Sequence, residues 1–463
     1  MRKLVLIGLA QALLVLAGCG GGSGSGIIIS PGNNGSGGGG GTPTNTITMT
    51  VDSGPDPSVS YDVDTPFITV TVCAPGSTTN CQVINHIEVD SGSYGLRILS
   101  SVLNPSLASA LHQQTAPGGN SVVECTEFAD GFTWGPVKVA DVQIGGESAS
   151  SVPMQVMGDP AYAQSSTAGG TTTSEIPTAC SSTGSEEDTV STFGANGIIG
   201  IGVFADDCGP ACDASVSGNQ NPGFYYQCPA STWSPANPCS EIAIAESAQV
   251  TDPVFFFQTD NNGVIVEFPS VPEGSSTATG TLIFGIGTQG NNMLNATTML
   301  TASPSYGDVS ATYTTQSGQQ QFLPYSYFDT GSNAYYFADD SIPAGQSCSS
   351  YPGFNRNNPD AWFCPNAELS LSATAMGQNG VQSTIDFTIG NAYNLFNSSS
   401  GTVFKDLGAS MGAQSSDCTS MSAASQDQSC SFDFGFPFFL GRNVYIAFAG
   451  ANTSGGVGPY YAY

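Results

Sequence analysis

The same short pattern occurs twice in this chain, and that duplication constrains the fold more than any other feature of the sequence. An apolar, β-favouring segment runs into Asp90-Ser91-Gly92-Ser93, and a second one runs into Asp329-Thr330-Gly331-Ser332. A carboxylate placed in buried territory is costly unless a nearby group stabilises it or shares its proton. Each of the two acids is therefore expected to have a partner elsewhere in the chain.

A second shared element follows each acid motif. Ile198-Ile199-Gly200 lies downstream of the first motif, and Phe439-Leu440-Gly441 lies downstream of the second at nearly the same interval. Such a match in order and spacing indicates one structural unit used twice. A single Asp-Ser-Gly means little in this chain, since Asp52-Ser53-Gly54 also occurs. The Pro55-Asp56-Pro57 that follows it predicts an ordinary turn.

The rest of the sequence favours strands over helices. The chain has 58 Gly and 28 Pro among its 463 residues. Apolar alternation typical of strands recurs in residues 46–51, 67–72, 137–144 and 264–268. Roughly 420 residues follow residue 45, which exceeds one typical core. We expect an all-β protein with few short helices, an N-terminal lobe over residues 46–270 and a C-terminal lobe over residues 271–463.

The first residues predict export and anchoring. Residues 1–18 have a basic start and an apolar stretch, and Leu16-Ala17-Gly18 stands directly before Cys19. This tripeptide resembles a bacterial lipobox, which implies cleavage before Cys19 and lipid attached to it. An ordinary secretory signal with a chance cysteine is the alternative. Residues 19–45 are mostly Gly, Ser, Thr, Asn and Pro, which predicts a flexible tether. Gly20-Gly21 after Cys19 favours the outer membrane over the inner membrane of a bacterial cell envelope.

The charge and the cysteine content limit the binding partners, disulfides and metal sites that can be expected. The net charge is −29 with only seven Lys and Arg, so nucleic acid is not an expected partner. Cys19 aside, twelve cysteines remain in an exported chain, which suggests up to six disulfides. The natural pairs between sequence neighbours are Cys73 with Cys81, Cys348 with Cys364 and Cys418 with Cys430. Metal binding is the competing interpretation of Cys208-x3-Cys212, but neither His86 nor His112 is near it in sequence. We expect neither a metal nor a cofactor.

The paired motifs resemble those of the pepsin-like, bilobal aspartic endopeptidases, over roughly residues 60–463. In that family each lobe supplies one Asp-Thr/Ser-Gly loop, with a later apolar-apolar-Gly strand beneath it. Residues 128–146 resemble the family's flap hairpin, residues 280–287 the strand that opens the second lobe, and residues 438–448 the last strand pair. The lipoprotein setting also resembles an uncharacterised proteobacterial lipoprotein family, for which no activity is implied.

The resemblance implies a pepsin-like two-lobed fold and a catalytic pair, Asp90 and Asp329, in a cleft between the lobes. Two neighbouring carboxyl groups share one proton. The ionised acid takes a proton from a bound water, and the protonated acid donates to the peptide carbonyl oxygen. The implied substrate is an extended polypeptide, and we expect a monomer.

Six residues are implied to support the pair. The family analogy assigns Ser91 and Thr330 to bracing the two loops, and Ser93 and Ser332 to hydrogen bonds with the outer carboxylate oxygens. Ordinary turn capping is the alternative for these four hydroxyls. Gly92 and Gly331 let the backbone turn tightly beside the acids.

The predicted flap departs from the family pattern. Phe128-Ala129-Asp130-Gly131 stands where a tyrosine followed by glycine is usual, and phenylalanine has no hydroxyl to donate. We expect Phe128, Asp130, Gly131 and Trp134 to face substrate. Trp134 is either a replacement donor or a packed hairpin aromatic.

Two functions remain open from the sequence. The first is an acid endopeptidase on the cell envelope. The second is a pepsin-fold surface or periplasmic binding protein, or scaffold, without hydrolytic activity. Intact aspartates favour the first, and the missing flap tyrosine and the lipid anchor favour the second.

Overall fold

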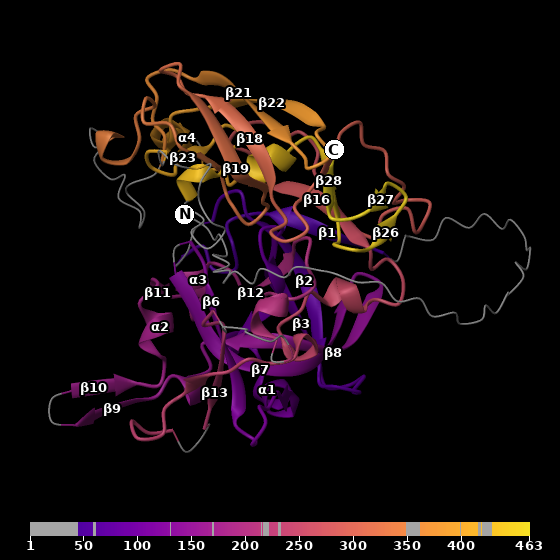
Figure 1. The fold of residues 1–463 in the computed structure, drawn as a ribbon, viewed down its shortest axis with the longest axis vertical. Helices are drawn as coiled ribbons and strands as arrows, with labels where there is room; N and C mark the ends of the chain where they lie inside the picture. The colour runs from indigo at the N-terminus through magenta and orange to yellow at the C-terminus, as the bar shows by residue number, and fades with distance from the viewer. Residues whose placement is uncertain are drawn as a thin grey trace, which may run out of the picture.

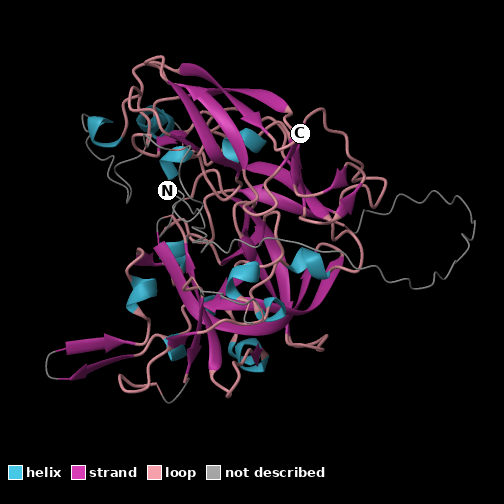
Figure 2. Ribbon diagram, viewed as in Figure 1, coloured by secondary structure: helices cyan, strands magenta, loops and turns pink. Residues whose placement is uncertain are grey.

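The computed structural model describes residues 45–58, 62–129, 131–168, 171–213, 215, 222–229, 233–348, 362–398, 400–414, 418 and 428–463. The expected signal and all of the expected tether but Asn45 lie outside these ranges, and so do Cys19 and Asp130. Strands dominate two bodies that lie one above the other, the first lobe in indigo and magenta and the second in orange and yellow (Figures 1 and 2). The all-β, two-lobed fold class expected from the sequence is confirmed. Among the described residues, no helix has the length and apolar character needed to span a bilayer.

Within the described residues, the first lobe is a set of strands with three short α-helices. Its strands are β2 (Pro66–Cys73), β3 (Cys81–Asp90), β4 (Tyr94–Leu99), β5 (His112–Gln113), β6 (Ser121–Glu127), β7 (Gly131–Ile144), β8 (Glu147–Met157), β9 (Ser165–Ala168), β10 (Thr171–Ser174), β11 (Ser185–Glu186), β12 (Gly197–Ile201), β13 (Tyr225–Cys228) and β14 (Ser240–Glu241). Its helices are α1 (Pro105–Ala110), α2 (Thr178–Ser181) and α3 (Val190–Phe193).

The second lobe is also built mainly of strands. Its strands are β18 (Val309–Thr314), β19 (Gln320–Phe328), β20 (Tyr335–Phe337), β21 (Leu369–Met376), β22 (Gln382–Ile389), β23 (Gly408–Ser410) and β24 (Asp433–Phe434), with α4 (Ala392–Ser398). β22 shows why these segments form half-buried strands: Ile385 and Phe387 are buried whereas Asp386 between them is exposed.

Strands from distant parts of the chain extend the first lobe's sheet. They are β1 (Thr46–Val51), β15 (Gly263–Glu267), β16 (Ala278–Phe284), β17 (Met299–Thr301), β25 (Asn443–Ala447) and β28 (Tyr460–Ala462), and the small hairpin of β26 (Asn452–Thr453) and β27 (Gly456–Val457) is a separate two-stranded sheet. β1 pairs with β16 and with β2, and β25 pairs with both β15 and β28. The first strand of the described chain thus lies within one sheet with the last.

Each lobe has the same four-strand unit around its acid. In the first lobe β12 lies between β3 and β4, parallel to β3, and β4 in turn pairs parallel with β8. In the second lobe β24 lies between β19 and β20, parallel to β19, and β20 pairs parallel with β23. The internal duplication predicted from the sequence is therefore present as matching strand order.

The register corrects one predicted element. Gly200 is opposite Asp90, and in the second lobe Phe434 is opposite Phe328, which places Gly435 beside Asp329. The unit that matches Ile198-Ile199-Gly200 is therefore Asp433-Phe434-Gly435, and the expected Phe439-Leu440-Gly441 is wrong. Phe439 ends a short 3-10 helix, and Leu440 bridges to Phe268 instead.

Close backbone approach explains the glycine in both units. A Cβ added at Gly200 would lie 2.3 Å from the Tyr94 backbone nitrogen, and one added at Gly435 would lie 2.0 Å from the Ala334 carbonyl oxygen. Side chains of any size are excluded at these two positions because the acid loop passes directly over them.

Six disulfides stabilise the structure, as the cysteine count suggested. Cys73–Cys81, Cys348–Cys364 and Cys418–Cys430 confirm the three expected pairs. Cys208 and Cys212 are bonded to each other, which makes the metal interpretation of that spacing wrong. The remaining two are Cys125–Cys180 and Cys228–Cys239. Disulfides of this number are typical of proteins that fold in an oxidising compartment.

Candidate active site

The fold brings Asp90 and Asp329 side by side. Asp90 ends β3, Asp329 directly follows β19, and both side chains are 0% exposed. A Cβ added at Gly92 would lie 2.6 Å from Asp329 Cγ, and one added at Gly331 would lie 2.6 Å from Asp90 Cγ. Each carboxyl group therefore rests against the glycine of the opposite loop. The two carboxyl groups are within hydrogen-bonding range of each other.

Ser91 and Thr330 cross-link the two loops. The Ser91 backbone N–H donates to Thr330 Oγ1 at 3.0 Å, and the Thr330 N–H donates to Ser91 Oγ at 2.9 Å. In turn Ser91 Oγ donates to the Phe328 carbonyl at 3.0 Å and Thr330 Oγ1 to the Val89 carbonyl at 2.7 Å. These hydroxyls bind the opposite loop and do not cap their own turn. A nearly symmetric set of hydrogen bonds therefore holds the two acid loops together.

The two acids differ in the hydrogen bonds that their carboxyl oxygens accept. The Gly92 N–H donates to Asp90 Oδ1 at 2.7 Å, and the Gly331 N–H donates to Asp329 Oδ1 at 2.8 Å. Ser332 Oγ then donates to Asp329 Oδ2 at 2.8 Å. On the other side Ser93 lowers the pKa of Asp90. Among the described residues, however, Asp90 Oδ2 and the Ser93 hydroxyl are buried without a hydrogen-bond partner. The motifs match in sequence but not in their hydrogen bonds.

Burial sets the protonation of the pair. Burial and the nearby Asp329 charge raise the pKa of Asp90 well above its usual range. Burial and the charge of Asp433 also raise the pKa of Asp329. Two carboxyl groups in one buried site cannot both ionise easily, so they titrate as a unit that retains a proton through acid pH.

Comparison with known proteins places the chain in a family. A family model described as "Protein of unknown function (DUF3443)" matches residues 41–463. The chain belongs to this family. No curated protein matches the chain. Among solved structures, the crystal structure of aspartic proteinase from Irpex lacteus is similar at 14% sequence identity and a TM-score of 0.45, covering 90% of this chain and 96% of the other.

Sequence reasoning missed one acid of this DUF3443 protein. Asp433 on β24 is 0% exposed, and its charge acts on Asp329. It occupies the position of Ile198 in the first lobe, where an apolar residue is expected. A search for apolar-apolar-Gly passes over Asp433-Phe434-Gly435 for that reason. The available signal is an acid inside the phenylalanine-rich segment 432–439.

The hairpin of β6 and β7 is present where the flap was predicted, but its aromatic residues point inward. Phe128 is 2% exposed and packs edge-on against Phe193. Trp134 is 1% exposed, and its indole N–H donates to the Tyr162 carbonyl at 2.8 Å. Both side chains are packed inside the first lobe, and the Trp134 N–H already has a backbone acceptor. The expectation that Phe128 and Trp134 face substrate stays a prediction. Gly131 is also buried, and its carbonyl accepts from the Phe128 N–H at the hairpin turn.

A buried ion cluster supports the first acid loop of the DUF3443 fold. Arg97 on β4 is 1% exposed and donates to Glu124 on β6 at 2.6 Å and to Asp207 at 3.0 Å. It also donates to the Tyr94 carbonyl, next to Ser93, at 2.7 Å. The Arg97 guanidinium group thus has two buried acidic partners.

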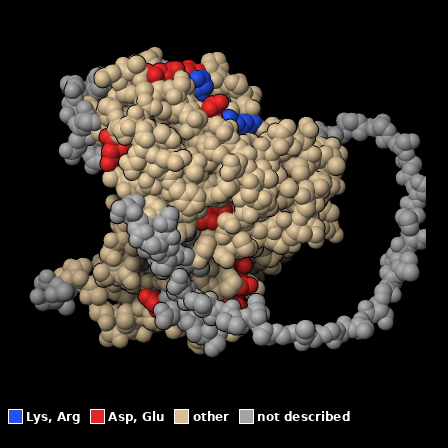
Figure 3. Space-filling view, turned by 45° about the horizontal axis from the view of Figure 1, so that its top comes forward, with Lys and Arg blue, Asp and Glu red and all other residues tan. Residues whose placement is uncertain are grey.

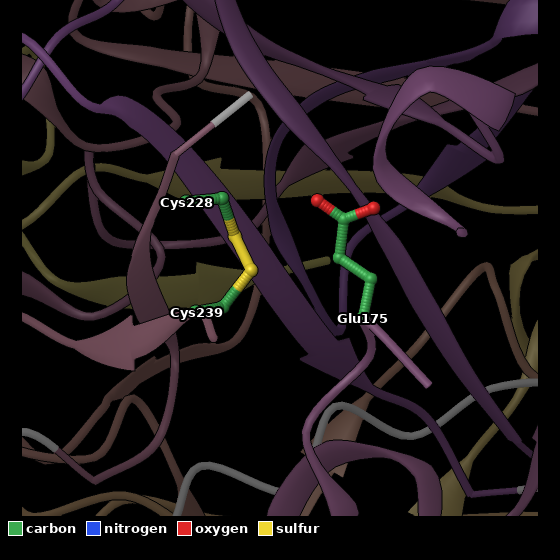
Figure 4. A group of neighbouring side chains, drawn as sticks. All are labelled: Glu175, Cys228 and Cys239. Carbon is green, nitrogen blue, oxygen red and sulfur yellow. A yellow bond between two sulfur atoms is a disulfide. The ribbon is translucent and has the colours of Figure 1, made fainter. Parts of the chain in front are cut away.

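One group of metal-binding residue types is close together in the described ranges. Glu175, Cys228 and Cys239 have ligand atoms within 4.8 Å of one another (Figure 4). Cys228 and Cys239 are bonded to each other as a disulfide, so neither offers a thiolate to a metal. This group is therefore structural in the oxidised protein.

Proposed function

We propose that this chain is an aspartic endopeptidase, which hydrolyses extended polypeptide by general acid and base catalysis. The observation that carries the proposal is the pair of buried carboxyl groups, Asp90 and Asp329, each packed against the glycine of the other's loop. The crossed Ser91 and Thr330 hydrogen bonds fix the pair, as catalysis by two positioned acids requires.

The chemistry follows from one shared proton. A water held between the acids attacks the peptide carbonyl carbon while it gives a proton to the ionised carboxylate. The protonated carboxyl group gives its proton to the carbonyl oxygen, and a tetrahedral diol forms. When a diol hydroxyl returns its proton, the C–N bond breaks and the leaving nitrogen takes up a proton. No bond forms between enzyme and substrate.

We also propose that the protein works on the bacterial cell envelope, anchored through lipid on Cys19. The six disulfides support an oxidising compartment. A body tethered by residues 19–45 would reach polypeptides near the membrane.

The test is hydrolysis of a denatured protein in acid, at about pH 3–5. The full chain is purified in detergent and compared with Asp90→Asn and Asp329→Asn, each expected to lose about a thousandfold in rate or more. Asp52→Asn is the matched control, because Asp52 belongs to the third Asp-Ser-Gly, where it accepts from the Gly54 N–H and pairs with His86. This control is expected to retain activity.

Equal hydrolysis by the wild type and both active-site variants would contradict the proposal. No hydrolysis by any form, together with no binding of pepstatin, would favour the binding or scaffold function instead.

A further inference from the structure

Arg97 holds the end of the first acid loop from inside the lobe. It lies on β4, the strand that leaves this loop, and it is 1% exposed. Its Nη1 donates to the carbonyl of Tyr94, the first residue of β4, at 2.7 Å. The neighbouring Ser93 carbonyl accepts from the Gly202 N–H at 3.0 Å. Two successive carbonyl groups of the acid loop are therefore fixed, and Arg97 fixes one of them.

The same guanidinium group binds the hairpin of β6 and β7, the predicted flap. Arg97 Nη2 donates to Glu124 Oε1 at 2.6 Å, and Arg97 Nε donates to Thr126 Oγ1 at 3.0 Å. Glu124 and Thr126 are both 0% exposed, and both lie on β6, the strand that leads to the hairpin turn at Phe128. One side chain thus bonds the acid loop and the hairpin at the same time.

A third contact closes this network on the acid loop. Arg97 Nη2 also donates to Asp207 Oδ2 at 3.0 Å, and Asp207 Oδ1 accepts from the Tyr225 hydroxyl at 2.5 Å. The Tyr225 hydroxyl in turn accepts from the Val250 N–H at 2.8 Å. Val250 packs against Gly95 of β4, where an added Cβ would lie 2.6 Å from Val250 Cγ1. The start of β4 is therefore held from two sides by connected, buried contacts.

The shape of the guanidinium group explains why an arginine is at this position. Its N–H groups lie in one plane and point in fixed directions. In Arg97 they reach a backbone carbonyl, a hydroxyl and two carboxylates that belong to three separate segments of the chain. A lysine ammonium is a compact point charge and cannot reach acceptors spread in this way. Arginine and lysine would both balance the buried acids here, but only arginine can bond all of these acceptors.

The second lobe has a tyrosine at the matching position. Arg97 is opposite Ile198 on β12, and Tyr336 on β20 is opposite Asp433 on β24. The Tyr336 hydroxyl donates to Asn333 Oδ1, in the second acid loop, at 2.6 Å. Both lobes therefore bind this strand position back to their own acid loop. A tyrosine carries no positive charge, so an ion cluster like that of Arg97 cannot form on it.

We propose that Arg97 is a positioning residue for the proposed hydrolysis: it couples the hairpin of β6 and β7 to the first acid loop and so fixes the Asp90 carboxyl group relative to Asp329. This inference rests on the proposed function. Arg97 acts through the Tyr94 carbonyl on one side and through β6 on the other. Misplacing a catalytic group by about 1 Å can lower a rate about a hundredfold, so loss of this coupling should reduce the rate of hydrolysis.

The first test compares hydrolysis of one denatured protein in acid with the urea midpoint of the full chain. Arg97→Lys keeps the charge and removes the planar fork, so kcat is expected to fall about tenfold or more while KM stays within about threefold. A triple variant, Arg97→Met with Glu124→Gln and Asp207→Asn, has no uncompensated charge in the cluster. Its urea midpoint should recover relative to Arg97→Met alone, but its kcat should stay low.

Arg442→Lys is the matched control. Arg442 also donates to a backbone carbonyl, that of Phe438, but it precedes β25 and lies outside both acid loops. We expect this variant to keep the kcat of the wild type.

The second test is amide hydrogen exchange, which needs no substrate. In the wild type the amides of β6 and of the first acid loop are expected to open as one unit. In Arg97→Lys, exchange of the β6 amides should become about tenfold faster, while that of β21 and β22 in the second lobe stays unchanged. Thr126→Val removes the acceptor of Arg97 Nε on the hairpin and should change exchange in the same direction by a smaller factor.

A kcat that recovers with the urea midpoint in the triple variant would overturn the proposal, because Arg97 would then serve only to balance buried charge. Wild-type kcat in Arg97→Lys, or unchanged exchange of β6 in that variant, would overturn it as well. If Arg97→Lys does not fold, the triple variant and Thr126→Val decide between these outcomes. If no form of the chain hydrolyses polypeptide, the proposed function fails, and hydrogen exchange by itself still supports or overturns the coupling.

Discussion

At the scale of single residues, the acid pair depends on two glycines that have no side chain as much as on the two acids themselves. Gly92 and Gly331 have no side chain, and the carboxyl group of the opposite acid fills that space. The sequence suggested these glycines as tight turns. The structure adds that each also forms a wall of the other lobe's acid site, which no reasoning within one motif could reveal.

Gly331→Ala is predicted to disrupt the acid pair. Its Cβ would lie 2.6 Å from Asp90 Cγ and 2.6 Å from Asp90 Oδ1, so the Asp90 carboxyl group or the loop must move. We expect a loss of about 1–3 kcal/mol in unfolding free energy from overpacking. Urea denaturation measures the loss, and hydrolysis should fall with it.

Gly290→Ala is the matched control. A Cβ at Gly290 would meet nothing within 4 Å, so its unfolding free energy should stay within about 0.5 kcal/mol of the wild type. Similar stability in the two variants would mean that the contact at Gly331 relaxes without cost.

At the scale of elements, the repeat could be predicted from the sequence only in part. The acid loops and the β12 segment have visible signals, because Asp-Ser/Thr-Gly and Ile198-Ile199-Gly200 follow simple residue patterns. β24 does not, because Asp433 breaks the apolar pattern while the nearby Phe439-Leu440-Gly441 happens to satisfy it. Strand pairing between segments a hundred residues apart decides which one is used, and that pairing is a tertiary property.

The sequence alone also could not predict which way the aromatic side chains of the expected flap hairpin point. Alternation along β6 and β7 predicts a hairpin, but both faces of this hairpin are largely buried, as the run of buried residues from Ser121 to Thr126 shows. Phe128 and Trp134 therefore pack in the core of the first lobe.

Arg97 on β4 forms an ion pair with Glu124 on β6, and removal of Arg97 is predicted to lower the unfolding free energy substantially. Arg97→Met would leave Glu124 and Asp207 buried without a counter-charge, which typically costs about 3–5 kcal/mol. Denaturant unfolding of this variant gives the value. A triple variant that also carries Glu124→Gln and Asp207→Asn should recover part of the loss, because it removes the uncompensated charges.

If the single and triple variants were equally unstable, the loss would come from packing of the Arg97 side chain and not from the buried charges.

At the scale of the whole molecule, acids outnumber bases 36 to 7, and many of the acids are inside. Figure 3 shows a face on which most visible side chains are neither acidic nor basic. Burial raises the pKa of Asp308 and of Glu273 to about 7, and that of Asp206 to about 6. The fold therefore accommodates these groups best in their neutral form.

Stability is predicted to be greatest in acid. A carboxyl group whose pKa is raised by folding contributes stability that is fully present below its unfolded pKa of about 4 and is lost as pH rises through the folded pKa. For Asp308 and Glu273 the loss spans about pH 4–7. The melting temperature is expected to fall from about pH 4 to pH 8, and Asp308→Asn should reduce the slope.

A melting temperature that rises over the same interval would contradict this view of the buried acids. The comparison is made in one buffer series at constant ionic strength, so that screening of surface charge does not change with pH.

The placement of β24 has a consequence for when the acid pair is assembled. β19 and β20 are made long before residues 433–434, yet β24 must enter between them, and β12 must likewise enter between β3 and β4. Such late, long-range insertion is slow compared with local folding. Until residues 433–434 have been made, the second acid loop has no strand beneath it, so the loop that holds Asp329 against Asp90 is completed only near the end of synthesis.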